Sequence, residues 1–83
     1  MELSWLNTFI TAAEEGNFRK AADKLHLAQS TVTLHIQNLE NELETQLFDR
    51  VGRTVQLNPI GHGFLQYAKT ILENYNESKE YIA

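Results

Sequence analysis

Two amphipathic helices, expected within residues 18–43 (FRKAADKLHLAQSTVTLHIQNLENEL), constrain the fold of this chain more than any other feature. Apolar side chains recur there at helical spacing, in two sets separated by a break near residues 26–28. The first set is Phe18, Ala21, Ala22 and Leu25, and the second is Val32, Ile36, Leu39 and Leu43. Each set marks the buried face of one helix. Two such helices joined by about four residues have the outline of a helix-turn-helix, whose second helix can enter the major groove of DNA.

The outward face of the second helix carries short polar side chains. At about 100° per residue, turning the apolar set inward leaves Ser30, Leu34, Gln37 and Asn41 outward, with Thr33 beside them. These groups suit base edges, because amides bind adenine in a bidentate manner, hydroxyls bind several bases and apolar carbon packs on a thymine methyl. A merely solvated face is the alternative, since most surface helices carry polar residues. The face alone therefore leaves both interpretations open.

Composition limits the chain to one domain with a modest core. A domain of 83 residues buries about 60% of the surface of its unfolded chain. The sequence contains no cysteine, which excludes disulfides and thiolate metal sites and suits a reducing compartment. Polar residues such as Asn7, Thr8 and Glu14 interrupt the apolar N-terminal run, so we expect neither a signal peptide nor a membrane span.

The formal net charge of −4 is unusual for a nucleic-acid binder, which is normally basic. Residues 1–16 contribute −3, residues 17–59 sum to zero and residues 60–83 contribute −1. The candidate reading unit is therefore neutral, which predicts a weak non-specific electrostatic term and binding that falls at modest salt. Its best phosphate-contact cluster lies on the exposed side of the first helix of the pair and consists of Arg19, Lys20 and Lys24. Such a cluster is also ordinary on a surface helix.

Local signals predict how the helices begin and end. Residues 2–15 carry a broad apolar face and predict an N-terminal helix that packs into the core. Gly16 suits the left-handed position that ends a helix, and Asn17 suits the N-cap of the next one. Leu27 is expected to fill the junction beneath the turn. Ala28 is a poor cap, so the following helix is expected either to fray at its start or to be capped by Ser30.

A β-hairpin is predicted after the second helix of the pair. Two short runs at residues 47–50 and 53–57 are separated by a Val-Gly dipeptide, and the second run alternates with a period of two. Arg50 and Arg53 are then expected near the hairpin tip. Arginines on a protruding tip beside a reading helix suit a narrow minor groove. Two solvent-facing arginines without a ligand are the alternative.

A long helix is predicted from residue 59 to the C-terminus. Asn58 is a good N-cap and Pro59 fits the first helical position. A helix of about 23 residues runs roughly 34 Å, farther than a domain of this size can cover, so its surplus apolar face predicts a partner, most simply a second copy. The residues expected in this dimer seam are Phe64, Leu65, Ala68, Ile71, Leu72, Tyr75 and Ile82. The pair Gly61 and Gly63 is expected to loosen the first turn and to act as a hinge.

This order of parts resembles the N-terminal winged helix-turn-helix domain of LysR-type transcriptional regulators. The matching residues are Phe9, Phe18, Ala21, Ala22, Leu25, Gln29, Val32, Thr33, Ile36, Leu39, Glu40, Leu43, Leu47, Phe48, Arg50, Arg53, Leu57, Pro59 and Gly61. The resemblance implies a mainly α fold, with residues 1–58 as a DNA-binding domain of three helices and a two-stranded wing. Residues 59–83 resemble the linker helix through which the family forms homodimers.

The resemblance also implies a biological setting. It predicts a bacterial, cytoplasmic, nucleoid-associated regulator that binds an inverted repeat in double-stranded DNA. In this family an effector-sensing domain similar to periplasmic binding proteins normally follows, and full-length proteins can form tetramers. The present chain is therefore expected to be the front fragment of a longer regulator, and a small-molecule effector would bind only to the part that follows.

Contact residues can be carried over from the family position by position. The family's usual contacts fall on Gln29, Ser30, Thr33, Leu34 and His35 of the second helix and on Arg50 and Arg53 of the wing. The full set of predicted DNA-binding residues adds Thr31 and Gln37 of the same helix and Arg19 and Lys20 of the preceding one. The chain departs from the family pattern at several of its positions. Ser30 stands where proline is frequent, Thr33 where serine is usual, and Leu34 where arginine is common. The loss of that guanidinium puts the sequence preference at one base pair in doubt, and we hypothesise that Leu34 reads a thymine methyl there.

Catalysis is poorly supported by the sequence. It contains no glycine-rich phosphate loop, and His26, His35 and His62 lack the i, i+4 spacing of a helical metal site. We therefore expect no catalytic residue, metal or cofactor. The serious alternative to DNA binding is a winged helix that binds protein partners with little DNA affinity, because the acidic balance fits such a role.

Overall fold

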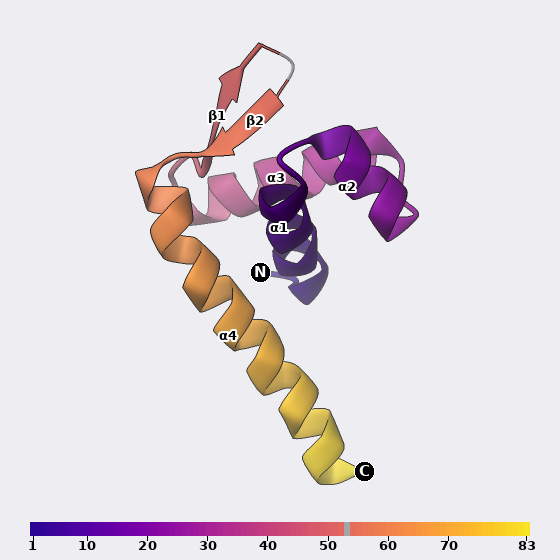
Figure 1. The fold of residues 1–83 in the computed structure, drawn as a ribbon. Helices are drawn as coiled ribbons and strands as arrows, with labels where there is room; N and C mark the ends of the chain where they lie inside the picture. The colour runs from indigo at the N-terminus through magenta and orange to yellow at the C-terminus, as the bar shows by residue number, and fades with distance from the viewer. Residues whose placement is uncertain (53) are drawn as a thin grey trace.

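The computed structural model describes residues 1–52 and 54–83, and its elements follow the predicted order (Figure 1). Within these residues, four helices and one antiparallel pair of strands make up the fold, which is mainly α as predicted. The elements are α1 (Leu3–Glu15), α2 (Phe18–Leu25), α3 (Gln29–Leu43), β1 (Phe48–Val51), β2 (Thr54–Leu57) and α4 (Pro59–Ile82). The prediction of a winged helix-turn-helix followed by a long helix is confirmed.

The boundary between α1 and α2 follows from two residues that the sequence identified. Gly16 adopts the left-handed conformation, with φ of 65°, and its N–H donates to the carbonyl of Ala12 at 2.9 Å. The Asn17 side chain then accepts a hydrogen bond from the backbone N–H of Lys20 at 2.9 Å. This bond satisfies one of the free N–H groups at the start of α2. Both capping predictions are confirmed.

The turn between α2 and α3 differs from the prediction. His26 takes the left-handed conformation that ends α2, and the N–H of Leu27 donates to the Ala22 carbonyl. The Leu27 side chain is 36% exposed, so the expectation that it fills the junction is wrong. Helix α3 begins directly at Gln29 with Ala28 as an N-cap that makes no side-chain hydrogen bond. The predicted Ser30 cap is therefore also wrong.

The core lies where α1 crosses α2, α3 and the first half of α4. Its centre is a row of phenylalanine rings contributed by different elements. Phe9 of α1 lies 5.5 Å from the ring of Phe48 in β1 and 5.4 Å from that of Phe64 in α4. Phe48 in turn meets Phe18 of α2 edge-on at 5.5 Å. The row ties the wing and α4 to the helix-turn-helix, and edge-to-face pairs of this kind add stability beyond the burial of their area.

The start of α4 is fixed by a close approach to the segment before β1. Asn58 accepts from the N–H of Gly61 at 2.8 Å, which confirms it as the N-cap, and its Nδ2 donates to the Gln46 carbonyl at 2.8 Å. Gly61 is buried, and a Cβ placed on it would overlap the carbonyl oxygen of Leu47. Glycine is thus needed here for close packing, a role different from the predicted hinge.

Helix α4 leaves the rest of the domain after its first turns. The molecule measures 45 × 26 × 19 Å, and the C-terminal half of α4 extends well away from the other elements (Figure 1). Beyond Leu72 every residue of the helix is exposed. The arrangement agrees with the expectation of a helix too long for one small domain to cover.

Candidate nucleic-acid interface

Helix α3 turns most of the predicted contact residues to solvent. Its apolar residues Val32, Ile36 and Leu39 are buried against the core, as predicted from their spacing. On the opposite side the predicted contact residues are exposed or half-buried, and these are Gln29, Ser30, Thr31, Thr33, Leu34 and Gln37. A surface of uncharged side chains, polar except for Leu34, therefore runs along the outside of α3.

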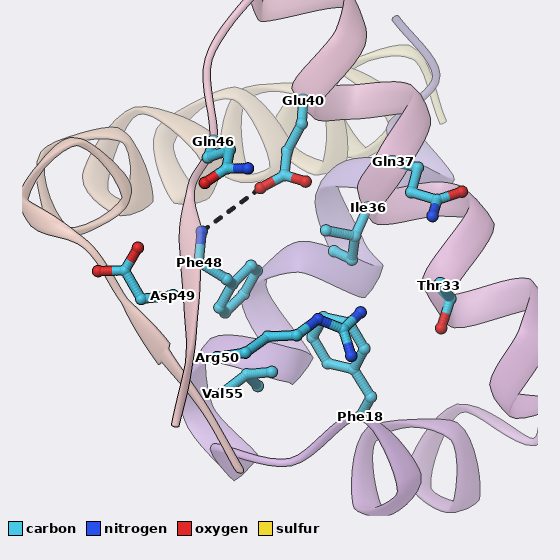
Figure 2. A pocket seen from close by; sticks show the side chains of 10 residues that line it. All are labelled: Phe18, Thr33, Ile36, Gln37, Glu40, Gln46, Phe48, Asp49, Arg50 and Val55. Atoms are coloured by element: carbon cyan, nitrogen blue, oxygen red, sulfur yellow. Dashed lines mark hydrogen bonds between the residues drawn. The ribbon is translucent and has the colours of Figure 1, made fainter. Parts of the chain in front are cut away.

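A cleft joins this surface to the wing. It has a volume of about 520 Å³ and lies between α3 and β1, with Thr33 and Gln37 on one wall and Phe48 and Arg50 on the other (Figure 2). A second hollow of about 380 Å³ adjoins it at the start of α3, where Gln29 and Thr33 lie near Arg50. The fold thus brings residues from distant parts of the sequence to one concave surface.

The side chain of Arg50 lines this cleft, while its backbone is one residue pair from the end of the hairpin. It is the third residue of β1 and pairs with Val55 of β2, while the strands end at the pair Val51 and Thr54. Its guanidinium lies over the ring of Phe18, 5.8 Å from the centroid, and points toward α3 (Figure 2). Contact with the ring orients the cation without neutralising it. Arg50 is thus close to the end of the hairpin as predicted, but its side chain lies in the cleft and not beyond the tip. Arg53 lies outside the described residues.

His35 stands apart from the other predicted contacts. Its Nδ1 and the Thr8 hydroxyl of α1 are 2.8 Å apart, so the ring is turned toward α1 and is half-buried there. The helical period explains this, because His35 follows Val32 by three residues and precedes Leu39 by four, and both are buried. The structure therefore assigns His35 to the contact between α1 and α3 rather than to the outward surface.

The basic residues of α2 divide into two groups. Arg19 and Lys20 are exposed, and Arg19 also lines the hollow that adjoins α3 and Arg50. Lys24 lies one turn further on and forms an ion pair with Glu15 of α1 at 3.5 Å. Arg19 is consequently the member of this cluster best placed to share a ligand with α3.

Glu40 holds the wing against α3, a role that the sequence did not reveal. One oxygen of its carboxylate accepts hydrogen bonds from the N–H groups of Leu47 at 2.7 Å and Phe48 at 3.4 Å (the longer one is drawn in Figure 2). The residues are seven and eight positions apart, and no local pattern predicts such a pairing. Because these N–H groups belong to the first residue of β1 and to the residue before it, this carboxylate sets where the wing starts relative to α3.

Glu40→Gln is expected to lower the free energy of unfolding by about 1–2 kcal/mol, because an amide oxygen is a weaker acceptor than a carboxylate. Urea unfolding followed by circular dichroism measures the change. Glu44→Gln is the matched control, since Glu44 is exposed at the end of α3. Equal effects of the two substitutions would show that Glu40 does not anchor the wing.

The predicted dimer residues of α4 lie on two different faces. Ala68 is fully buried, and Phe64 and Leu65 pack against the core of the same chain, which corrects their assignment to a dimer seam. Leu72 is half-buried beside Leu3 of α1. A row of exposed apolar side chains runs along α4 and is here called the α4 stripe. Its members are Ile60, Tyr67, Ile71, Tyr75 and Ile82, of which Ile60 and Tyr67 were not predicted. Three of these were predicted, namely Ile71, Tyr75 and Ile82.

Within residues 1–52 and 54–83, no three histidine or acidic side chains are grouped as metal ligands would be. Over the same part of the chain, no helix combines the length and apolar character that crossing a membrane requires.

Comparison with known proteins gives consistent results. The family described as "Bacterial regulatory helix-turn-helix protein, lysR family" matches residues 3–62. The chain is 49% identical over 78 residues to the HTH-type transcriptional regulator CitR of Bacillus subtilis, covering 94% of this chain and 27% of CitR. It is 48% identical over 77 residues to the regulator BenM of Acinetobacter baylyi, covering 93% of this chain and 25% of BenM. The chain thus spans about a quarter of the length of these relatives.

Solved structures show the same similarity in three dimensions. The DNA-binding domain of CbnR, crystallised with DNA, superposes with a TM-score of 0.94 at 40% identity, covering 98% of this chain and 93% of that one. The DNA-binding domain of BenM, crystallised with benA site 1 DNA, gives a TM-score of 0.89 at 45% identity over the whole of both chains. The matched residues include α1, α2, α3, the wing and the start of α4. The chain therefore belongs to the lysR family of bacterial regulatory helix-turn-helix proteins.

Proposed function

We propose that this chain is the DNA-binding part of a bacterial transcriptional regulator and that it binds double-stranded DNA sequence-specifically. The observation that carries the proposal is the uncharged outward surface of α3, which faces a cleft shared with the wing cation Arg50. The major groove admits an α-helix, so α3 can enter it while the wing contacts the neighbouring backbone or minor groove. The DNA complexes of the similar CbnR and BenM domains support this use of the fold.

The side chains divide by chemistry into two kinds of contact. Base edges are contacted by the outward residues of α3, which are Gln29, Ser30, Thr31, Thr33, Leu34 and Gln37. We assign phosphate contacts to Arg19 and Arg50, which line the hollow beside this surface, and to the exposed Lys20 next to Arg19. For Arg53 we retain a minor-groove contact, which rests on the sequence alone. In this assignment every named residue contacts DNA and none has a catalytic role, so the chain would regulate transcription through binding alone.

We further propose that residues 1–58 form the reading domain and that α4 joins two copies into a homodimer. The support is the α4 stripe, whose five apolar side chains remain 40% to 81% exposed in the single chain. A two-fold dimer would present two α3 helices about one turn of DNA apart, roughly 34 Å, to an inverted repeat. This chain spans about a quarter of the length of its relatives. We therefore also propose that effector binding and tetramer formation depend on a further part of the regulator, and that the regulator is cytoplasmic and nucleoid-associated.

The proposal is tested by selecting binding sites from a random duplex library. The wild type is expected to enrich a two-fold symmetric site, and Gln37→Ala is expected to relax the preference at one base pair in each half-site. Gln66→Ala, an exposed amide on α4, is the control and should select the wild-type site. If a folded dimer enriches nothing even at low salt, the DNA-binding proposal fails and a protein-binding winged helix takes its place.

The phosphate contact of Arg50 predicts a specific salt dependence. In Arg50→Ala the slope of log K against log salt should become shallower by about 2 for a dimer, because one phosphate contact is lost in each subunit. Affinity should fall by a similar factor for specific and non-specific duplexes. Lys24→Ala is the control, because Lys24 pairs with Glu15 and lines neither hollow. An unchanged slope in Arg50→Ala would exclude the phosphate contact.

A further inference from the structure

Leu34 is the large apolar side chain that α3 exposes on its outward surface. It is 53% exposed, while the other large apolar residues of α3 are buried or half-buried against the domain. Its neighbours one turn away on the same surface are Ser30 and Gln37, both exposed and uncharged. An exposed leucine can be incidental on any protein surface. Here, however, it stands at the centre of the surface proposed to enter the major groove.

The side chains around Leu34 restrict which bases α3 can read. The helix contains neither lysine nor arginine, so it lacks the bidentate arginine that is the commonest reader of guanine. Its amides and hydroxyls can bond to base edges, but Leu34 can neither donate nor accept a hydrogen bond. The feature of the major groove that matches an aliphatic side chain is the C5 methyl group of thymine.

We propose that Leu34 is a specificity-determining residue that packs on the C5 methyl of one thymine in each half-site. The inference rests on the proposed function, because it requires α3 to lie in the major groove. Burial of the leucine against the methyl removes apolar surface of both groups from water, which supplies the attraction. Because only the methyl is recognised by this contact, 5-methylcytosine should satisfy Leu34 as well as thymine does, whereas cytosine and uracil should not.

The experiment uses duplexes that differ by one methyl group. After a site has been selected from the random library, each thymine of one half-site is replaced singly by deoxyuridine, and affinity is measured by fluorescence anisotropy. For the wild type we expect one replacement to weaken binding about fourfold, the factor given by burial of one methyl group. At the same position a cytosine should bind more weakly, and its 5-methylation should recover about fourfold.

Two leucine variants separate the Leu34 contact from other effects. Leu34→Ala should lose the sensitivity to the methyl group while it still binds the site, and circular dichroism verifies its fold. Leu27→Ala is the matched control, because Leu27 is an exposed leucine in the α2–α3 turn, and it should keep the wild-type sensitivity. The methyl comparisons on the wild type need no variant, so they test the proposal even if Leu34→Ala folds poorly.

The possible outcomes distinguish this proposal from the one on which it depends. If the wild type selects a site but tolerates uracil at every thymine, the Leu34 contact is excluded and DNA binding stands. The same conclusion follows if Leu34→Ala retains the sensitivity of the wild type. If the wild type selects no duplex at all, the proposed function itself fails and the Leu34 contact fails with it.

Discussion

Replacing Ile71 and Tyr75 by glutamate is expected to convert the proposed homodimer into a monomer and to weaken binding to a two-fold symmetric duplex about a hundredfold or more. Both side chains belong to the α4 stripe and are 40% and 43% exposed in the single chain, so their loss should leave the fold intact. In a dimer interface two buried carboxylates per subunit would lack partners, which is strongly unfavourable. Analytical ultracentrifugation measures the state of association, and anisotropy measures the affinity.

The control for this double variant must match its charge, because added glutamates repel DNA from any position. Gln66→Glu with Thr70→Glu adds the same two charges to α4 at exposed positions outside the stripe. We expect this control to remain dimeric and to lose only a small part of its affinity. Equal association of the two double variants would mean that the α4 stripe does not join the subunits. Equal loss of DNA affinity would mean that charge, and not dissociation, explains the effect.

The elements of this fold could be predicted from the sequence because the signals for them are local. The spacing of Val32, Ile36 and Leu39 fixes which face of α3 is buried, and that in turn fixes the outward face. Gly16 and Asn17 act on their immediate neighbours, so their roles as helix end and helix start were readable without any tertiary information. The residues on the outward face of α3 could therefore be predicted from the sequence, whereas their positions relative to the wing could not.

The contacts between side chains of different elements could not be predicted from the sequence. The cleft position of Arg50 depends on Phe18, a residue thirty-two positions earlier that α2 brings beneath the wing. The hydrogen bonds from Leu47 and Phe48 to Glu40 depend on how the chain turns after α3. Family resemblance put His35 among the DNA contacts, although its helical position beside the buried residues favours the contact with Thr8 that the structure shows.

Gly61 and Gly63 of α4 are equivalent by local sequence but differ in their tertiary contacts, and this difference predicts a large effect on stability. Gly61→Ala is expected to lower the free energy of unfolding by about 3 kcal/mol, at the upper end of the usual cost of overpacking. The added Cβ would overlap the backbone carbonyl oxygen of Leu47 and would lie 2.9 Å from Cδ2 of Leu57. A backbone carbonyl cannot yield as a flexible side chain can, so α4 would have to move away from the wing.

Gly63→Ala provides the matched control two residues later in the same helix. A Cβ at Gly63 would have nothing within 4 Å, so alanine there should raise the free energy of unfolding by about 0.5–1 kcal/mol through its higher helix propensity. Urea unfolding of both variants tests the pair. Opposite signs are expected from identical chemical changes, because only Gly61 lies against the segment that precedes β1. If Gly61→Ala also stabilised the protein, α4 would not be packed against Leu47, and the wing would have to be anchored in another way.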